Sequence, residues 1–95
     1  MSDNAMRSHK EAMEFDATME IIGQVMACYT TKIHREKSKE KPNYTLIEHW
    51  DEERKRCAER QDGLIKEGPK VWEKVRVSYG AKVRAMMQEI KSYGK

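Results

Sequence analysis

A repeat of apolar residues in the N-terminal third of the chain constrains the fold more than any other feature. Between positions 15 and 33, the spacing from one apolar residue to the next alternates between four and three. The residues of this repeat are Phe15, Met19, Ile22, Met26, Tyr29 and Ile33. Because residues three and four apart share one face of an α-helix, the repeat predicts an amphipathic helix. It covers fewer than three heptads, which is too short to indicate a coiled coil.

The first predicted helix spans about residues 8–40. Ser8 and Glu11 have the spacing of a capping box at its start. Pro42 follows its end, because the residue before a proline is displaced from the helical conformation. We expect residues 1–7 to form a flexible N-terminus. Residues 8–95 should form a single domain, since a chain of 95 residues has the size of one domain.

Two further helices are separated by a glycine and a proline. Thr45 and Glu48 form a second capping box, which predicts a helix from residue 46 to residue 61 or 66. Gly68 suits the position just after this helix, and Pro69 suits the first turn of the next. The predicted fold is therefore all-α, with a long first helix, a charged second helix and a long basic third helix in a hairpin or bundle.

The second helix has the weakest apolar stripe. Positions 54 and 61, which belong to that stripe, are Arg and Gln, and the segment between residues 51 and 62 is almost wholly charged. A helix buries its stripe only where another apolar stripe meets it. We therefore expect the first helix and the third helix, over about residues 69–93, to pack mainly against each other. The second helix should act as a partial cover.

This arrangement leaves the first helix with more apolar surface than it can bury. A second apolar edge of Ile21, Val25 and Cys28 lies beside the repeat, and Gly23 next to it would permit a close approach. A contiguous apolar patch without a partner in its own chain is typical of an interface. We therefore expect a homodimer. The predicted self-association residues are Phe15, Met19, Ile21, Ile22, Val25, Met26, Cys28 and Tyr29.

The sequence lacks the patterns that carry chemistry. Its three histidines and two cysteines do not have the spacing of a zinc or di-iron site. It has no glycine-rich phosphate loop and no nucleophile motif. We therefore expect no enzyme, no metal and no cofactor. No apolar run approaches the roughly 18 residues of a membrane span, so we expect a cytoplasmic protein with reduced thiols and no membrane contact.

The third helix is the strongly basic part of the chain. The net charge is +3, but residues 69–95 alone carry seven basic and two acidic side chains. The basic residues opposite the apolar stripe are Lys70, Lys74, Arg84, Lys91 and Lys95. Such a face can bind phosphate groups or an acidic protein, or it can simply be solvated. Trp50 is a second candidate contact, because tryptophan is enriched among interface anchors, although core packing is equally open for it.

Two hypotheses for the function follow from these features. The first is a small non-enzymatic protein-binding regulator or inhibitor, similar in type to an antitoxin, an adaptor or an anti-defence protein, acting through a helical surface. The alternative is a nucleic-acid-binding protein that uses the basic face of the third helix.

Overall fold

The computed structural model describes the backbone of residues 2–93 and the side chains of residues 9–92. This part of the chain forms three helices and no strand: α1 (Ser2–Lys37), α2 (Tyr44–Leu64) and α3 (Pro69–Tyr93). The all-α prediction is confirmed, and so are the bounds of the third helix. The first helix begins six residues before its predicted start, so Ser8 is an interior residue of α1 and not its N-cap. The flexibility of residues 1–7 stays a prediction.

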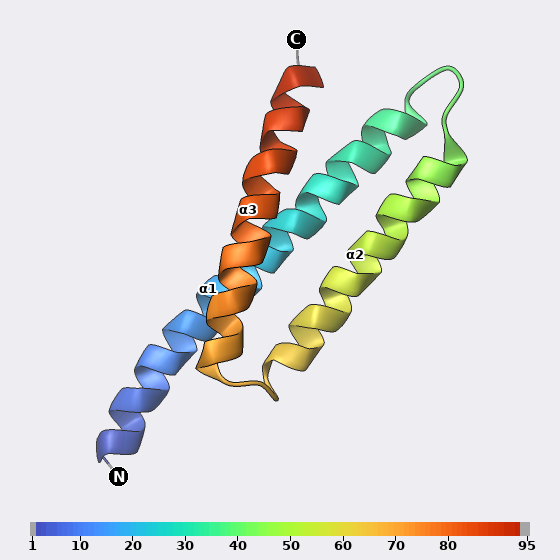
Figure 1. Ribbon diagram of the computed structural model, residues 1–95. Coiled ribbons are helices and arrows are strands. Elements are labelled where there is room, and N and C mark those ends of the chain that lie inside the picture. Colours follow the sequence, from blue (N-terminus) through green and yellow to red (C-terminus); the bar gives the residue numbers. More distant parts are fainter. Residues whose placement is uncertain (1, 94–95) are drawn as a thin grey trace.

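The central element is α1. Both α2 and α3 pack along it and make only weak contact with each other. In Figure 1, α2 and α3 diverge from the short turn that joins them, and α1 crosses behind α3 so that its C-terminal half appears between the two. The molecule is elongated, with extents of 61 × 25 × 16 Å. The expectation that the first and third helices pack mainly against each other is therefore wrong, since α2 packs along α1 to about the same extent as α3 does.

Polar residues allow the charged α2 to pack against α1. Arg54 donates a hydrogen bond to Oγ1 of Thr30 at 3.1 Å and also pairs with Asp51. Gln61 donates from Nε2 to the carbonyl oxygen of Met19 at 3.1 Å. These two positions interrupt the apolar stripe in the sequence. In the structure they form hydrogen bonds between the two helices, so polar contacts continue the interface where the apolar stripe is interrupted.

The second apolar edge of α1 is covered by α3. That edge consists of Ile21, Val25 and Cys28. Contacts to α3 flank it: Arg76 donates to Oγ1 of Thr18 at 2.9 Å, and Lys32 forms an ion pair with Glu89. Val25 is 0% exposed and Cys28 is 5% exposed within the single chain. Val25 and Cys28 therefore need no partner from outside the chain, whereas Ile21 is half-buried.

The core runs along both seams of α1. Its fully buried side chains are Thr18, Ile22, Val25 and Leu64. At the N-terminal end, the rings of Phe15 and Trp72 meet edge to face, with centroids 5.3 Å apart and planes inclined at 65°. Such aromatic pairs add about 0.5–1.5 kcal/mol beyond their buried area.

The turn between α1 and α2 is organised by a buried carboxylate. Glu36 is 5% exposed. It accepts a hydrogen bond from the backbone N–H of Asn43 at 3.0 Å and pairs with Lys39 at 2.9 Å. Asn43 in turn accepts from the backbone N–H of Leu46 at 3.1 Å and caps α2. The predicted capping residue, Thr45, lies inside the first turn of α2, since the helix begins at Tyr44 and Asn43 is its N-cap.

The turn between α2 and α3 also differs from its prediction. Helix α2 ends at Leu64 with Ile65 as its C-cap, so Gly68 is not the residue that ends it. Gly68 instead directly precedes α3, and its carbonyl oxygen accepts from the backbone N–H of Trp72 at 3.2 Å. The indole of Trp72 donates from Nε1 to the carbonyl oxygen of Leu64 at 2.8 Å, which satisfies one of the free carbonyls at the end of α2.

The Glu36 contacts make stability dependent on pH. Hydrogen bonds from Lys39 and from the N–H of Asn43 hold the pKa of the Glu36 carboxyl below its ordinary value of 4.5. This stabilisation is present above pH 4.5 and is lost as the pH falls through the lowered pKa. We expect Glu36→Gln to lower the free energy of unfolding at neutral pH and to approach the wild type in acid. Urea titrations across pH test this, with the exposed Glu59→Gln as the control.

Candidate functional site

One face of α1 is covered by neither of the other helices. It is called the open face here and consists of Met13, Ala17, Glu20, Gln24, Ala27 and Thr31. Their spacing alternates between four and three, so they form one line along the helix, opposite the core repeat. Five of the six are exposed and Thr31 is half-buried. The line therefore has the spacing of a helix-packing seam, and no helix among residues 2–93 covers it.

A shallow groove joins the open face to α3. The groove has a volume of about 250 Å³, and its lining residues are Gln24, Ala27, Cys28, Thr31, Met87, Ile90 and Lys91. Met87 is 50% exposed although its side chain is apolar. Lys91 places a cation at the rim. The α1–α3 groove is thus apolar inside and basic at its edge.

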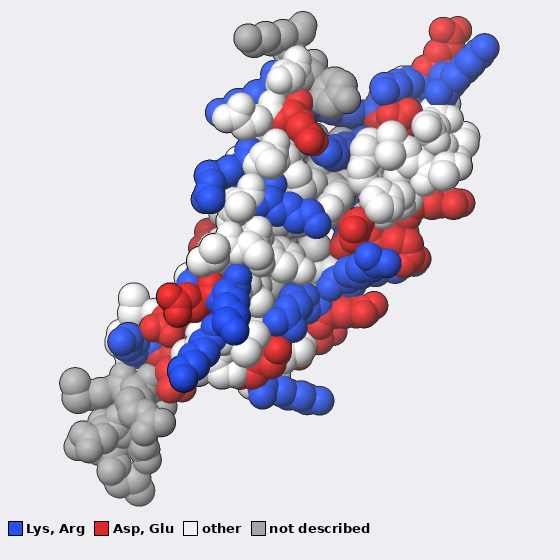
Figure 2. All heavy atoms as spheres, in the orientation of Figure 1, with Lys and Arg blue, Asp and Glu red and all other residues white. Residues whose placement is uncertain are grey.

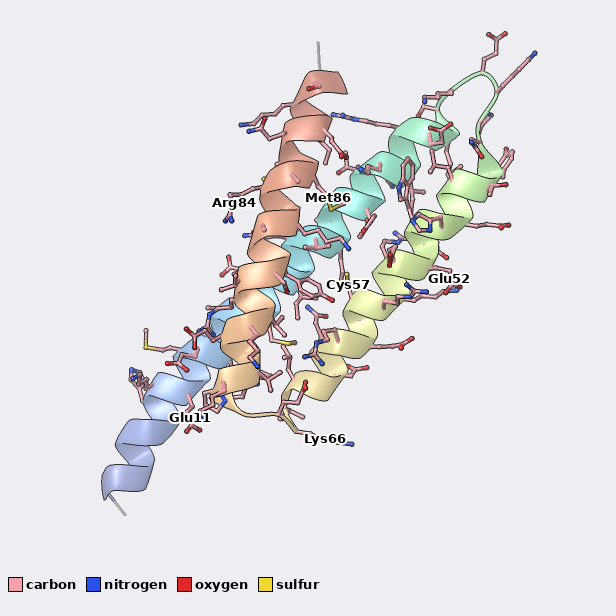
Figure 3. The ribbon with its side chains drawn as sticks, viewed as in Figure 1. Glu11, Glu52, Cys57, Lys66, Arg84 and Met86 are labelled. Atoms are coloured by element: carbon pink, nitrogen blue, oxygen red, sulfur yellow. The ribbon has the colours of Figure 1, made fainter. Side chains whose placement is uncertain are left out.

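The predicted basic residues of α3 lie along its outer side. Lys70, Lys74, Arg84 and Lys91 are all exposed, and none of them forms an ion pair with the side chains that the structure describes. In Figure 3, Arg84 points away from the other helices while its neighbour Met86 points toward α1. Lys95 lies outside the described residues. We call the first four residues the outer line of α3.

Other cations of α3 face inward. Arg76 donates to the carbonyl oxygen of Glu14 at 3.2 Å as well as to Thr18. The ammonium of Lys82 lies 5.5 Å from the centroid of the Tyr29 ring, and interaction with the Tyr29 side chain raises the pKa of Lys82 above its ordinary value. Lysine and arginine follow α3 over the visible surface in Figure 2, whereas acidic side chains gather along α2. Arg76 and Lys82 therefore contact residues of α1, whereas the outer line faces solvent.

The two cysteines are buried and unlinked. Burial raises the pKa of both the Cys28 and the Cys57 thiols, so the reactive thiolate is disfavoured in each. Figure 3 shows Cys57 pointing from α2 into the interior. Both side chains belong to the apolar core, where cysteine packs as a small hydrophobic residue.

Trp50, predicted as a possible partner contact, is half-buried against the core. The ammonium of Lys32 lies 5.5 Å from the centroid of its ring. A small hollow of about 50 Å³ beside it is also lined by Arg35, Glu36 and Lys39. Arg35 donates to the carbonyl oxygen of Ile90 at 2.8 Å. Since these charges already have partners, the structure favours packing as the role of Trp50.

The predicted self-association residues belong to the core of the single chain or pack against it, and their role in self-association stays a prediction. Ile22, Val25, Cys28 and Tyr29 are buried, and the remaining four pack partly buried against the core. The open face was missed because alanine, glutamine, threonine and glutamate give no apolar signal. The signal that could have found it was the four–three spacing of those small and polar residues.

Within the described side chains, no three His, Cys, Asp or Glu residues gather where they could hold a metal ion. None of the three helices, over the part described, is both apolar and long enough to cross a membrane. No family model, curated protein or solved structure matches this chain.

Proposed function

We propose that this protein is a small non-enzymatic protein-binding regulator or inhibitor that acts through the open face of α1 and the adjoining α1–α3 groove. The observation that carries the proposal is the four–three line of exposed residues on α1, which continues into a groove with the half-exposed Met87 at its edge. A helix seam without a partner in its own chain is suited to receive a helix from another chain.

The chemistry of the groove favours a particular kind of partner. Apolar side chains would fill the space between Ala27, Met87 and Ile90. Lys91 at the rim, with Arg84 about one helical turn before Met87, would attract carboxylates that flank those side chains. The proposed partner therefore presents an amphipathic helix with acidic residues along its edges. A cytoplasmic protein of the antitoxin, adaptor or anti-defence type would act in this way, by occupying another protein's surface.

Substitution of Met87 tests this proposal. Met87→Glu puts a carboxylate into the groove and should abolish the retention of a specific protein that co-purifies with the tagged wild type from its native host. Val77→Glu is the matched control, because Val77 is also exposed and apolar but lies on the outer side of α3. If every co-purifying protein is retained equally by both variants, the groove is not the binding surface.

A second candidate function is binding to nucleic acid, favoured by the outer line of α3. Its four cations lie within residues 70–91 of one helix, a span of about 32 Å, and make no ion pair within the described side chains. Exposed cations in a line can neutralise successive phosphates and release their counterions. By contrast, Arg54, Arg56 and Arg60 of α2 pair with acidic residues of the same chain.

Salt-dependent binding to duplex DNA tests the second candidate. Replacing Lys70, Lys74 and Lys91 together with glutamine should weaken binding and flatten the slope of log K against log [salt] by about 2 to 3. The control replaces three other exposed lysines, Lys10, Lys41 and Lys66, and changes the net charge equally. Equal effects of the two triple variants, or no binding at low salt, would rule out a dedicated phosphate-binding line.

A further inference from the structure

The charges of α1 are divided between its two halves. Residues 10–20 carry one basic and four acidic side chains, residues 21–30 carry none, and residues 31–37 carry three basic and one acidic. The helix therefore changes from a net −3 to a net +2 across an uncharged centre. That uncharged centre contains Gln24 and Ala27 of the open face.

The helix dipole does not account for this division. Acidic residues near a helix N-terminus are stabilised, but the effect is confined to the first turn. Asp16 and Glu20 are 14 and 18 residues from Ser2, where α1 begins. Both side chains are exposed and form no ion pair with the described residues of the chain. Their position on and beside the open face needs another explanation.

A second copy of α1 running in the opposite direction matches the open face in both shape and charge. Antiparallel pairing about the uncharged centre puts Gln24 opposite Ala27 and Glu20 opposite Thr31. The same register puts Asp16 opposite Arg35, which is exposed and also donates to the carbonyl oxygen of Ile90. Parallel pairing would instead put Asp16, Glu20 and Arg35 each against its own copy, and like charges in contact oppose association. The small side chains of Ala17 and Ala27 permit the two helices to approach closely.

The α1–α3 groove adds to the same complementarity. Lys91 lies beside Thr31 at the groove's rim, at the basic end of the open face. In the antiparallel pair, this end of one copy meets the acidic end of the other. Lys91 and Arg35 would therefore both face the segment of the second copy that contains Asp16 and Glu20.

We infer that the open face of α1 is the interface of an antiparallel homodimer, in which the acidic end of α1 in each copy lies on the basic end in the other. This inference rests on the proposed function and names a second copy as an occupant of the proposed binding surface. Because the dimer and a complex with another protein use the same residues, the two exclude each other. The monomer–dimer equilibrium then controls how much binding surface is available.

Charge reversal tests both the interface and its direction. Sedimentation equilibrium should find a dimer for the wild type that weakens at high salt. The acid-reversed variant, Asp16→Lys with Glu20→Lys, should raise the dimer dissociation constant about tenfold or more. The base-reversed variant, Arg35→Glu with Lys91→Glu, should do the same. Combining all four substitutions should restore dimerisation, because opposite charges again face each other.

A matched alanine pair locates the interface. Ala27→Glu should weaken the dimer, whereas Ala81→Glu, on the outer side of α3, should leave it unchanged; circular dichroism verifies that each variant is folded. A wild type that stays monomeric at high micromolar concentration would overturn the inference. The inference would also be overturned if Ala27→Glu left the dimer intact. It would likewise be overturned if combining the acid-reversed and base-reversed variants weakened the dimer further instead of restoring it. If the wild type is a monomer and Met87→Glu still abolishes retention of the protein partner, only the homodimer is overturned. The proposed function would then stand.

Discussion

Val25→Asp is expected to unfold the protein. Val25 is 0% exposed, between α1 and α3. An aspartate there would be buried without a cationic partner or would have to be protonated, and either state costs several kcal/mol. Total stabilities of about 5–15 kcal/mol are typical, and a short chain lies toward the lower end of that range because it buries less of its surface. The substitution therefore removes most or all of the stability.

Circular dichroism and urea titration measure this outcome. Val77→Asp is the control, because it makes the same chemical change at a residue that is 69% exposed on α3. The control should change the free energy of unfolding by no more than about 0.5 kcal/mol. A folded, monomeric Val25→Asp variant of normal stability would mean that this edge of α1 lies at the surface, as the sequence pattern had suggested.

Leu64→Ala is expected to destabilise the protein by about 2–5 kcal/mol. Leu64 is 0% exposed at the end of α2, where the chain turns toward α3. Truncating it removes apolar contacts and leaves a cavity, because the surrounding residues are held in place. One of those constraints is the hydrogen bond from the Trp72 indole to the carbonyl oxygen of Leu64 itself.

The neighbouring residue provides the control for Leu64. Ile65 is 73% exposed, so Ile65→Ala removes a similar volume of side chain from solvent and not from the core. Its cost should stay within about 0.5 kcal/mol. Equal losses for Leu64→Ala and Ile65→Ala in urea titrations would contradict the packing at this end of α2.

The helices themselves could be predicted from the sequence. The apolar repeat beginning at Phe15 predicts α1, and the break at Pro69 marks the start of α3 to the residue. The end of α2 was less certain, because the sequence left residues 61 and 66 both open, and the structure places the end between them at Leu64. Capping was also misassigned, since both Asn43 and Thr45 are suitable capping residues and only the path of the turn through Glu36 distinguishes them.

The candidate site was harder to predict from the sequence than the helices were. Reasoning from apolar residues pointed to Val25 and Cys28, which α3 buries. The open face contains residues such as Ala27 and Gln24, and these residue types do not by themselves indicate a binding surface. Each residue of the outer line of α3 was predicted from the sequence, because the helical period shows which residues lie opposite the apolar stripe. That its cations lack ion pairs within the described side chains emerged only from the fold.

Periodicity and helix breakers are local properties, so the sequence by itself determined that this chain is helical, where its helices lie and which face of each is apolar. Which helix covers which face depends on contacts between residues far apart in the chain. Only the tertiary structure decided that α2 covers one side of α1 and α3 the other. The physical reason is that Arg54 and Gln61 of α2 form their hydrogen bonds to α1 only once the two helices are in register. With α2 and α3 packed in this way, the open face from Met13 to Thr31 stays uncovered.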